Sequence, residues 1–209
     1  MSSIWFTSDT HYGHKNIVRG TSDWEEKSRC RNFDTMEEHN EALVNNINKV
    51  VKADDTLYHL GDWSFGGKEQ IYNFRKQINC KNINLILGNH DQWLEKKTVR
   101  VQDGNFTEYY SDLFQIVSPY LEVKYAGEHF ILSHYAMRVW NKSHKGSYHL
   151  YAHSHASLEN NPYGKSMDVG IDNAYRLLNE YRPFHLNEIV EILNKRKILL
   201  IDHHNENTN

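Results

Sequence analysis

Short apolar runs alternate with amphipathic stretches through the first half of the chain. Runs of strand length, rich in Ile, Leu, Phe and Tyr, occur at 4–8, 56–60 and 82–87. Apolar positions at helical spacing occupy 36–52 and 68–77. Thr35, followed three residues later by Glu38, marks the start of the first helix. Strands and helices in this alternation predict parallel βαβ units.

The second half of the chain is richer in short strands, and we expect a more antiparallel sheet there. Strands are predicted at 121–125, 129–133, 148–152 and 166–169. A last helix is predicted at 187–195, with a closing strand at 198–201. No internal repeat, low-complexity linker or break in composition divides the chain. We therefore expect one domain over 1–202, with 203–209 as a flexible polar tail.

Composition and charge argue against several classes of protein. Hydrophobic residues make up 39% and charged residues 24% of the 209, as in ordinary globular domains. No apolar run approaches the ~20 residues that span a bilayer, and residues 1–9 lack the pattern of a secretory signal. Cys30 and Cys80 form no CxxC pair, which argues against a thiolate zinc site and fits a cytoplasmic protein. A net charge of −3 gives no strong sign of nucleic-acid binding.

Polar side chains of metal-binding type directly follow five of the predicted strands. In chain order they are Asp9 with His11, Asp62, Asn89 with His90 and Asp91, His134, and His153 with His155. Ligands of α/β proteins gather in the crevice at the carboxyl ends of strands. Members of the two pairs Asp9/His11 and His153/His155 are two residues apart, so in an extended segment each pair faces one side. The pattern predicts one site built from several loops.

The donor set of this site is mixed nitrogen and oxygen, without sulfur. It suits Mn, Fe, Zn, Ni or Co better than an all-oxygen Ca or Mg cage. Seven of these side chains, all except His90 and Asp91, are candidate ligands, which is more than one tetrahedral zinc uses. Two ions that share a bridging carboxylate are therefore the economical interpretation.

In this order, the segments resemble the calcineurin-like metallophosphoesterase superfamily, whose pattern is D-x-H, G-D, G-N-H-D/E, a lone H and G-H-x-H. The corresponding segments here are Asp9-Thr10-His11, Gly61-Asp62, Gly88-Asn89-His90-Asp91, His134 and Ala152-His153-Ser154-His155. The opening motif is further similar to a small single-domain bacterial and phage subgroup. Ala152 stands where the family has Gly, which fits if the backbone there is ordinary extended strand.

The resemblance implies an α/β fold, a two-sheet β-sandwich of mixed strands flanked by helices in αββα order. It also implies two divalent transition-metal ions, with Mn the first expectation and Fe, Zn, Ni or Co as alternatives. Three ligands would hold each ion, namely Asp9, His11 and His155 for one and Asn89, His134 and His153 for the other. Asp62 would bridge the two ions. His90 would be the acid catalyst, and Asp91 would orient its ring.

The implied activity is hydrolysis of a small phosphoester by a hydroxide held between the ions. A phosphodiester of nucleotide type is favoured, because few residues are left for a cap over the crevice. A phosphomonoesterase with the same site, a different metallohydrolase and a catalytically silent binding scaffold are the alternatives. Arg138, His14 and Asn16 are predicted to contact substrate, and the charged segment 19–32 could form a loop over the site. The oligomeric state stays open.

Overall fold

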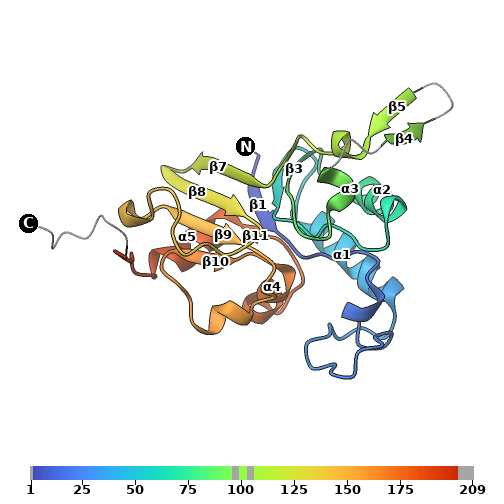
Figure 1. Ribbon diagram of the computed structural model, residues 1–209, viewed down its shortest axis with the longest axis horizontal. Helices are drawn as coiled ribbons and strands as arrows, with labels where there is room; N and C mark the ends of the chain where they lie inside the picture. Colours follow the sequence, from blue (N-terminus) through green and yellow to red (C-terminus); the bar gives the residue numbers. More distant parts are fainter. Residues whose placement is uncertain (1, 96–98, 103–105, 202–209) are drawn as a thin grey trace, which may run out of the picture.

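The first sheet grows from the three strands predicted in the N-terminal half. The computed structural model describes residues 2–95, 99–102 and 106–201 (Figure 1). Strands β1 (Ile4–Thr7), β2 (Thr56–His59), β3 (Asn82–Ile86) and β6 (Ile116–Ser118) pair in parallel in that order. Their carboxyl ends therefore meet at one edge of the sheet, as the βαβ pattern predicted. The short strand β11 (Phe184–His185) completes the other side, antiparallel to β1.

Both faces of this sheet are covered, which explains why its strands are apolar throughout rather than alternating. Helices α1 (Met36–Val50) and α2 (Lys68–Gln77) cover one face with the buried side chains of Leu43, Ile47, Ile71 and Phe74. The predicted capping box at Thr35 and Glu38 is present at the start of α1. A single helical turn, α3 (Gln92–Glu95), follows the third strand's loop.

The second sheet packs against the other face of the first. Its strands are β7 (Tyr120–Tyr125), β8 (Glu128–Ser133), β9 (Tyr148–Tyr151) and β10 (Ser166–Asp168). Phe6 and Leu60 from the first sheet meet Phe130, Leu132 and Leu150 from the second in a shared core. Figure 1 shows the two sheets side by side, with α1 and α2 beyond the first sheet. The predicted two-sheet α/β sandwich flanked by helices is confirmed.

The second sheet is mixed, so the expectation of a more antiparallel sheet is met only in part. Only the β7/β8 hairpin is antiparallel, whereas β9 pairs in parallel with both β8 and β10. The long connection 134–147 returns the chain to the edge where β8 began, so β9 runs in the same direction. A consequence is that β8 and β9 also end at a common edge, where His134 and His153 follow.

Several further elements differ from the predictions. Residues 198–201 form no strand, so the predicted closing strand is wrong; the strand that completes the first sheet beside β1 is β11. Helix α4 (Ile171–Leu178), strands β6 and β11, and the hairpin of β4 (Val99–Gln102) and β5 (Phe106–Tyr109) were not predicted. The last helix, α5 (Leu186–Asn194), is confirmed within a residue at each end. The expected tail 203–209 lies outside the described residues.

The single-domain prediction remains an expectation. Among the helices of the described segments, none combines the length and apolarity needed to cross a bilayer.

Candidate metal centre

The loops after the first two strands are joined to each other by backbone hydrogen bonds. The Asp9 N–H donates to the Gly61 carbonyl and the His11 N–H donates to the Asp62 carbonyl, each at 3.0 Å. These bonds continue the β1/β2 pairing beyond the ends of the strands. They hold the first two motifs at a fixed separation.

Two glycines allow the loops after β2 and β3 to approach closely. A Cβ atom on Gly61 would lie 2.5 Å from the Gly88 nitrogen, and a Cβ on Gly88 would lie 2.3 Å from Oδ1 of Asp62. Gly61 also has a φ of +98°, which side chains strongly disfavour. The glycines of the G-D and G-N-H-D motifs are therefore required by the contact between the two loops.

Five candidate ligands have left-handed backbone conformations, with φ between 46° and 66°: Asp9, His11, Asp62, His153 and His155. The expectation that the two pairs lie in extended segments is therefore wrong. Tight turns bring the side chains of each pair together instead of strand alternation. Ala152 is not among the residues with positive φ and is buried in the core, so alanine fits there without strain.

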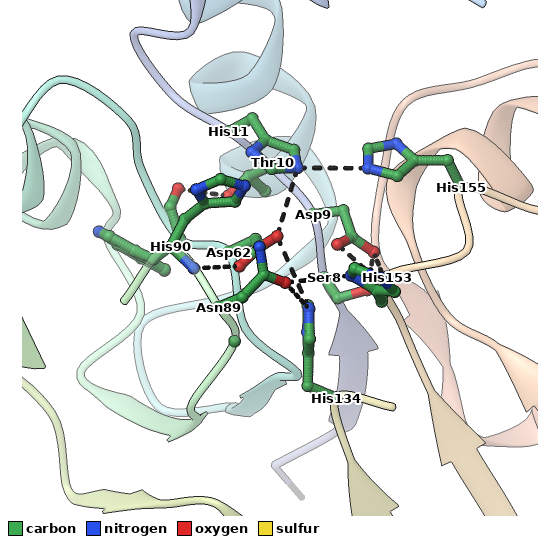
Figure 2. Close-up of polar contacts among 12 residues, drawn as sticks. Ser8, Asp9, Thr10, His11, Asp62, Asn89, His90, His134, His153 and His155 are labelled. Atoms are coloured by element: carbon green, nitrogen blue, oxygen red, sulfur yellow. Dashed lines mark hydrogen bonds and ion pairs between the residues drawn. The ribbon is translucent and has the colours of Figure 1, made fainter. Parts of the chain in front are cut away.

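The predicted ligands converge from both sheets on one point (Figure 2). Three groups have ligand atoms that all lie within 4.8 Å of one another. The groups are Asp9, His11 and His155; His11, Asp62 and His90; and Asp62, His134 and His153. Because neighbouring groups share His11 or Asp62, the candidate donors of the described residues form one continuous set.

Asp62 lies at the middle of this set. Its Oδ2 is 3.6 Å from Nε2 of His11 and 3.6 Å from Nε2 of His134. Its Oδ1 accepts a hydrogen bond from the His90 N–H at 2.9 Å. The carboxylate is only 2% exposed, so water cannot balance its charge.

The hydrogen bonds of the histidines fit a bound cation. Nδ1 of His134 lies 2.7 Å from the Leu60 carbonyl, which can only accept, so Nδ1 carries the proton. In the neutral ring, Nε2 then turns a lone pair toward the Asp62 carboxylate. Nε2 of His134 is also 3.1 Å from the Asn89 Oδ1, another acceptor. A cation between them would interact favourably with all three acceptor atoms, namely His134 Nε2, Asp62 Oδ2 and Asn89 Oδ1. Metal-bound histidines commonly donate their other ring N–H to a carbonyl or carboxylate, as His134 does to Leu60.

Burial shifts the pKa values of Asp9 and His11, the two candidate ligands of the first motif, in opposite directions. Burial raises the pKa of Asp9 to about 8, and the nearby charges of Asp168 and Asp62 add to the effect. Burial and the charge of Arg31 hold the pKa of His11 well below its ordinary value. A neutral imidazole is the form that binds metal, and a cation would offset the cost of a buried Asp9 carboxylate.

His90 and Asp91 differ in their surroundings. The exposed ring of His90 lies 5.4 Å from the His11 ring and 5.1 Å from the Phe65 ring, between centroids. The Asp91 carboxylate is buried and accepts backbone N–H bonds from Asp62, its neighbour Trp63, and Gly88 at 2.8–3.1 Å. The structure thus gives Asp91 a role other than the predicted orientation of the His90 ring. It ties the loops after β2 and β3 together, because turns leave N–H groups that need an acceptor.

A buried ion pair behind His155 was missed by sequence reasoning. The guanidinium of Arg31 donates to both oxygens of Asp172 at 2.9 and 2.8 Å, and to the carbonyls of Asp9 and Thr10. Oδ2 of Asp172 also accepts from Nδ1 of His155 at 2.7 Å. Burial alone would lower the pKa of His155, but this bond outweighs it and raises the pKa.

This arrangement fixes the proton of His155 on Nδ1 and directs Nε2 to the centre, 3.3 Å from Nε2 of His11. Arg31 comes from the charged segment 19–32, and Asp172 from the unpredicted helix α4. Neither residue belongs to one of the sequence motifs, so nothing in the sequence beyond its being an ionisable residue pointed to a role for either.

We expect Asp172→Asn to weaken Mn binding by roughly 10- to 100-fold, the usual cost of losing a hydrogen bond to a metal-bound histidine. The amide can turn its NH₂ toward His155 and no longer enforces the required tautomer. Competition with a coloured chelator measures the affinity. Glu188→Gln is the control, because it weakens the ion pair with Arg182 (2.6 Å), away from the site. A lower melting temperature with unchanged Mn affinity in Asp172→Asn would restrict Asp172 to a structural role.

The loop that carries His153 and His155 is hydrogen-bonded to a second buried carboxylate, that of Asp168. Asp168 accepts from the Ser154 hydroxyl and from the backbone N–H of Ala156 at 3.0 Å and Gly170 at 2.6 Å. On the other side, Oδ1 of Asn89 is 3.0 Å from Nδ1 of His153. The second sheet's ligands are thus fixed to the first sheet's loops.

Two hollows adjoin the donor set. The larger, of about 1000 Å³, is lined by His11, His90, His153 and His155 together with the predicted substrate residues His14 and Asn16. The smaller, of about 570 Å³, is lined by Asn89, Gly88 and Tyr135, among others. Arg138 lines neither; it borders a third hollow of about 210 Å³ that contains no predicted ligand. Its contact with substrate therefore stays a prediction without support from the geometry.

Comparison with known proteins gives matches over nearly the whole chain. A family model described as calcineurin-like phosphoesterase matches residues 2–208. An uncharacterized protein of Methanocaldococcus jannaschii is 28% identical over 202 residues, 95% of this chain and 96% of its own. The gene 66 protein of Mycobacterium phage L5 is 38% identical over 94 residues, 44% of this chain and 41% of its own. A crystal structure of a protein of unknown function from Aquifex aeolicus covers 92% of this chain with a TM-score of 0.58 at 20% identity, and shares the fold.

Proposed function

Because the chain belongs to the calcineurin-like phosphoesterase family, we propose that it is a two-metal phosphodiesterase acting on small diesters of nucleotide type. The observation that carries the diester preference is the pair of separate hollows beside the donor set. They share no lining residue, and each touches different candidate ligands. A diester places a substituent on both sides of phosphorus, whereas a monoester needs room for only one.

The proposed metal ligands follow from the donor groups. One ion would be held by Asp9, His11 and His155, the other by Asn89, His134 and His153, and Asp62 would serve both. Mn is the proposed native metal, because it accepts this mixture of imidazole, carboxylate and amide oxygen. When bound, the ions would acidify water and offset the negative charge on the phosphoryl oxygens.

The chain's own residues would divide the remaining work. His90, exposed at the wall of the larger hollow, would give a proton to the leaving oxygen. The Asp62 carboxylate, through its bond from the His90 N–H, would hold that loop at a fixed distance from the ligands. Asp172 and Asp168 would keep His155 and its loop in place. These groups are held by hydrogen bonds within the protein, without any contribution from substrate, as electrostatic preorganisation requires.

A phosphomonoesterase is the second candidate, since the same donors would suit it. The discriminating experiment compares bis-(p-nitrophenyl) phosphate with p-nitrophenyl phosphate, using metal-free protein before and after loading with Mn. We expect Mn-dependent turnover of the diester to exceed that of the monoester. Turnover of the monoester alone would change the substrate class and keep the site. Bound Mn without turnover of either ester would favour the silent scaffold.

A further inference from the structure

The larger hollow has a wall of aromatic rings that begins beside His90. The Phe65 ring lies 5.1 Å from the His90 ring, the His14 ring 4.0 Å from that of Phe65, and the Trp24 ring 5.9 Å from that of His14. All four residues line the hollow. The Trp24 side chain ends this row and is 45% exposed, so a large apolar surface is available to a ligand.

We propose that this row of rings is the subsite for the leaving group and that it accepts a nucleoside. The proposal rests on the proposed phosphodiesterase function and names which half of the diester departs. His90 lines the larger hollow and not the smaller one, so the oxygen that it protonates must lie in the larger hollow. The group attached to that oxygen then extends along the rings.

The length of the row decides between a simple aryl group and a nucleoside. A ring bonded directly to the ester oxygen would lie over Phe65, the ring next to His90. Trp24 is two rings farther on and is reached only by a ring carried on a spacer, as a base is carried on a sugar. All nucleobases stack on indole, so this contact favours a flat aromatic ring and does not distinguish one base from another. Arg29 also lines the hollow and suits an anionic ester, whereas Lys15 there is paired with Asp23 at 2.9 Å.

The reaction balances as hydrolysis. Water forms a new bond to phosphorus and releases one proton to the solvent, from which His90 later regains the proton that it donates, while the bond from phosphorus to the nucleoside oxygen breaks. That oxygen takes a proton from His90, and the nucleoside leaves with a free hydroxyl. The other substituent stays on the phosphoryl group, on the side of the smaller hollow.

The methyl ester of adenosine 5′-monophosphate tests the assignment, because both of its ester oxygens are primary alkoxides of poor leaving ability. The subsite, rather than the chemistry, then decides which bond breaks. With the Mn-loaded protein we expect adenosine and methyl phosphate, identified by chromatography and phosphorus NMR. Trp24→Ala should raise KM for this ester by roughly 10-fold, the effect of losing one stacked ring. KM for bis-(p-nitrophenyl) phosphate should rise much less, because its ring would lie over Phe65 rather than Trp24.

Two further variants control the experiment. Trp24→Phe keeps a ring and should restore most of the affinity. Trp93→Ala removes a comparably exposed indole, 37% exposed, that lies on α3 beneath the Lys68 ammonium and lines neither hollow. It should leave KM unchanged. Equilibrium dialysis of adenosine should show weaker binding to Trp24→Ala than to Trp93→Ala.

The outcomes separate the subsite from the function. Adenosine monophosphate and methanol as products, or an unchanged KM in Trp24→Ala, would overturn the leaving-group assignment while leaving the phosphodiesterase in place. Failure of the wild type to hydrolyse either diester after Mn loading would overturn both.

Discussion

Replacing Asp62 with Asn should remove the stabilisation of the fold by Mn and slow diester hydrolysis by at least about 10³-fold. The loss corresponds to the several kcal/mol of charge stabilisation that metal ions supply. Asp62 carries this expectation because its Oδ2 is equidistant, at 3.6 Å, from Nε2 of His11 and of His134. Each of those histidines belongs to a different proposed ion, so one substitution weakens both.

The same variant should fold at least as well as wild type when no metal is present. Burial is the main cause of the raised pKa values of Asp9 and Asp91, and the charge of Asp62 raises both further, so these buried carboxyl groups repel one another. An amide removes that repulsion. Thermal unfolding of metal-free and Mn-loaded protein, with metal content measured alongside, checks both expectations.

Asp54→Asn is the matched control for this experiment, because it makes the same change at an exposed carboxylate paired only with Lys81 among the contacts seen. It should respond to Mn like wild type. If Asp62→Asn keeps a full complement of metal, Asp62 does not bridge the ions and the two-ion assignment needs another common ligand.

His90→Ala should slow an ester with a poor alkoxide leaving group by roughly 10²–10⁴-fold, the usual range for general acid catalysis. It should change the hydrolysis of a p-nitrophenyl ester far less, because nitrophenolate departs without a proton. The position of His90 supports this role, since its ring is exposed to the larger hollow and lies 5.4 Å from the ring of His11. Single-substrate kinetics on a methyl and a p-nitrophenyl diester measure the ratio.

The alternative role for His90 is as a metal ligand, because one of its ring nitrogens lies with a ring nitrogen of His11 and a carboxylate oxygen of Asp62 in one possible donor group. In that case both esters would slow equally and Mn content would fall. His14→Ala provides a comparison, since His14 lines the same hollow without contacting Asp62 through a backbone bond. We expect it to affect the two esters to a similar extent.

Much of this architecture was readable in the sequence for a physical reason. Buried parallel strands need continuous apolar runs, and the runs at β1, β2 and β3 were located to within a residue or two. The sequence therefore predicted correctly that the side chains following β1, β2 and β3 lie at one edge of a sheet. The structure brings all seven predicted ligands together, although their assignment to metal stays a proposal.

What the sequence missed depends on contacts between distant segments. Arg31 and Asp172 are 141 positions apart and meet only because α4 returns to the loops of β1. β11 pairs over two residues only, too short for a periodic pattern, yet it completes the first sheet beside β1, whereas 198–201, the predicted closing strand, forms none. The family resemblance implied that Asp91 orients the His90 ring, but its carboxylate accepts backbone N–H groups of the loops after β2 and β3.

The left-handed backbone conformation at five candidate ligands also limits which substitutions can accumulate at these positions. Asp9, His11, Asp62, His153 and His155 occupy a backbone region that β-branched residues find costly and that Gly, Asn and Asp tolerate. Descendants released from selection for metal would thus still be held to a narrow set of residues by the shape of the chain. Loss of the site in such a lineage would appear first as Asn or Gly at these positions, with Val and Ile absent, and a chain that looks nearly intact by alignment could already be inactive.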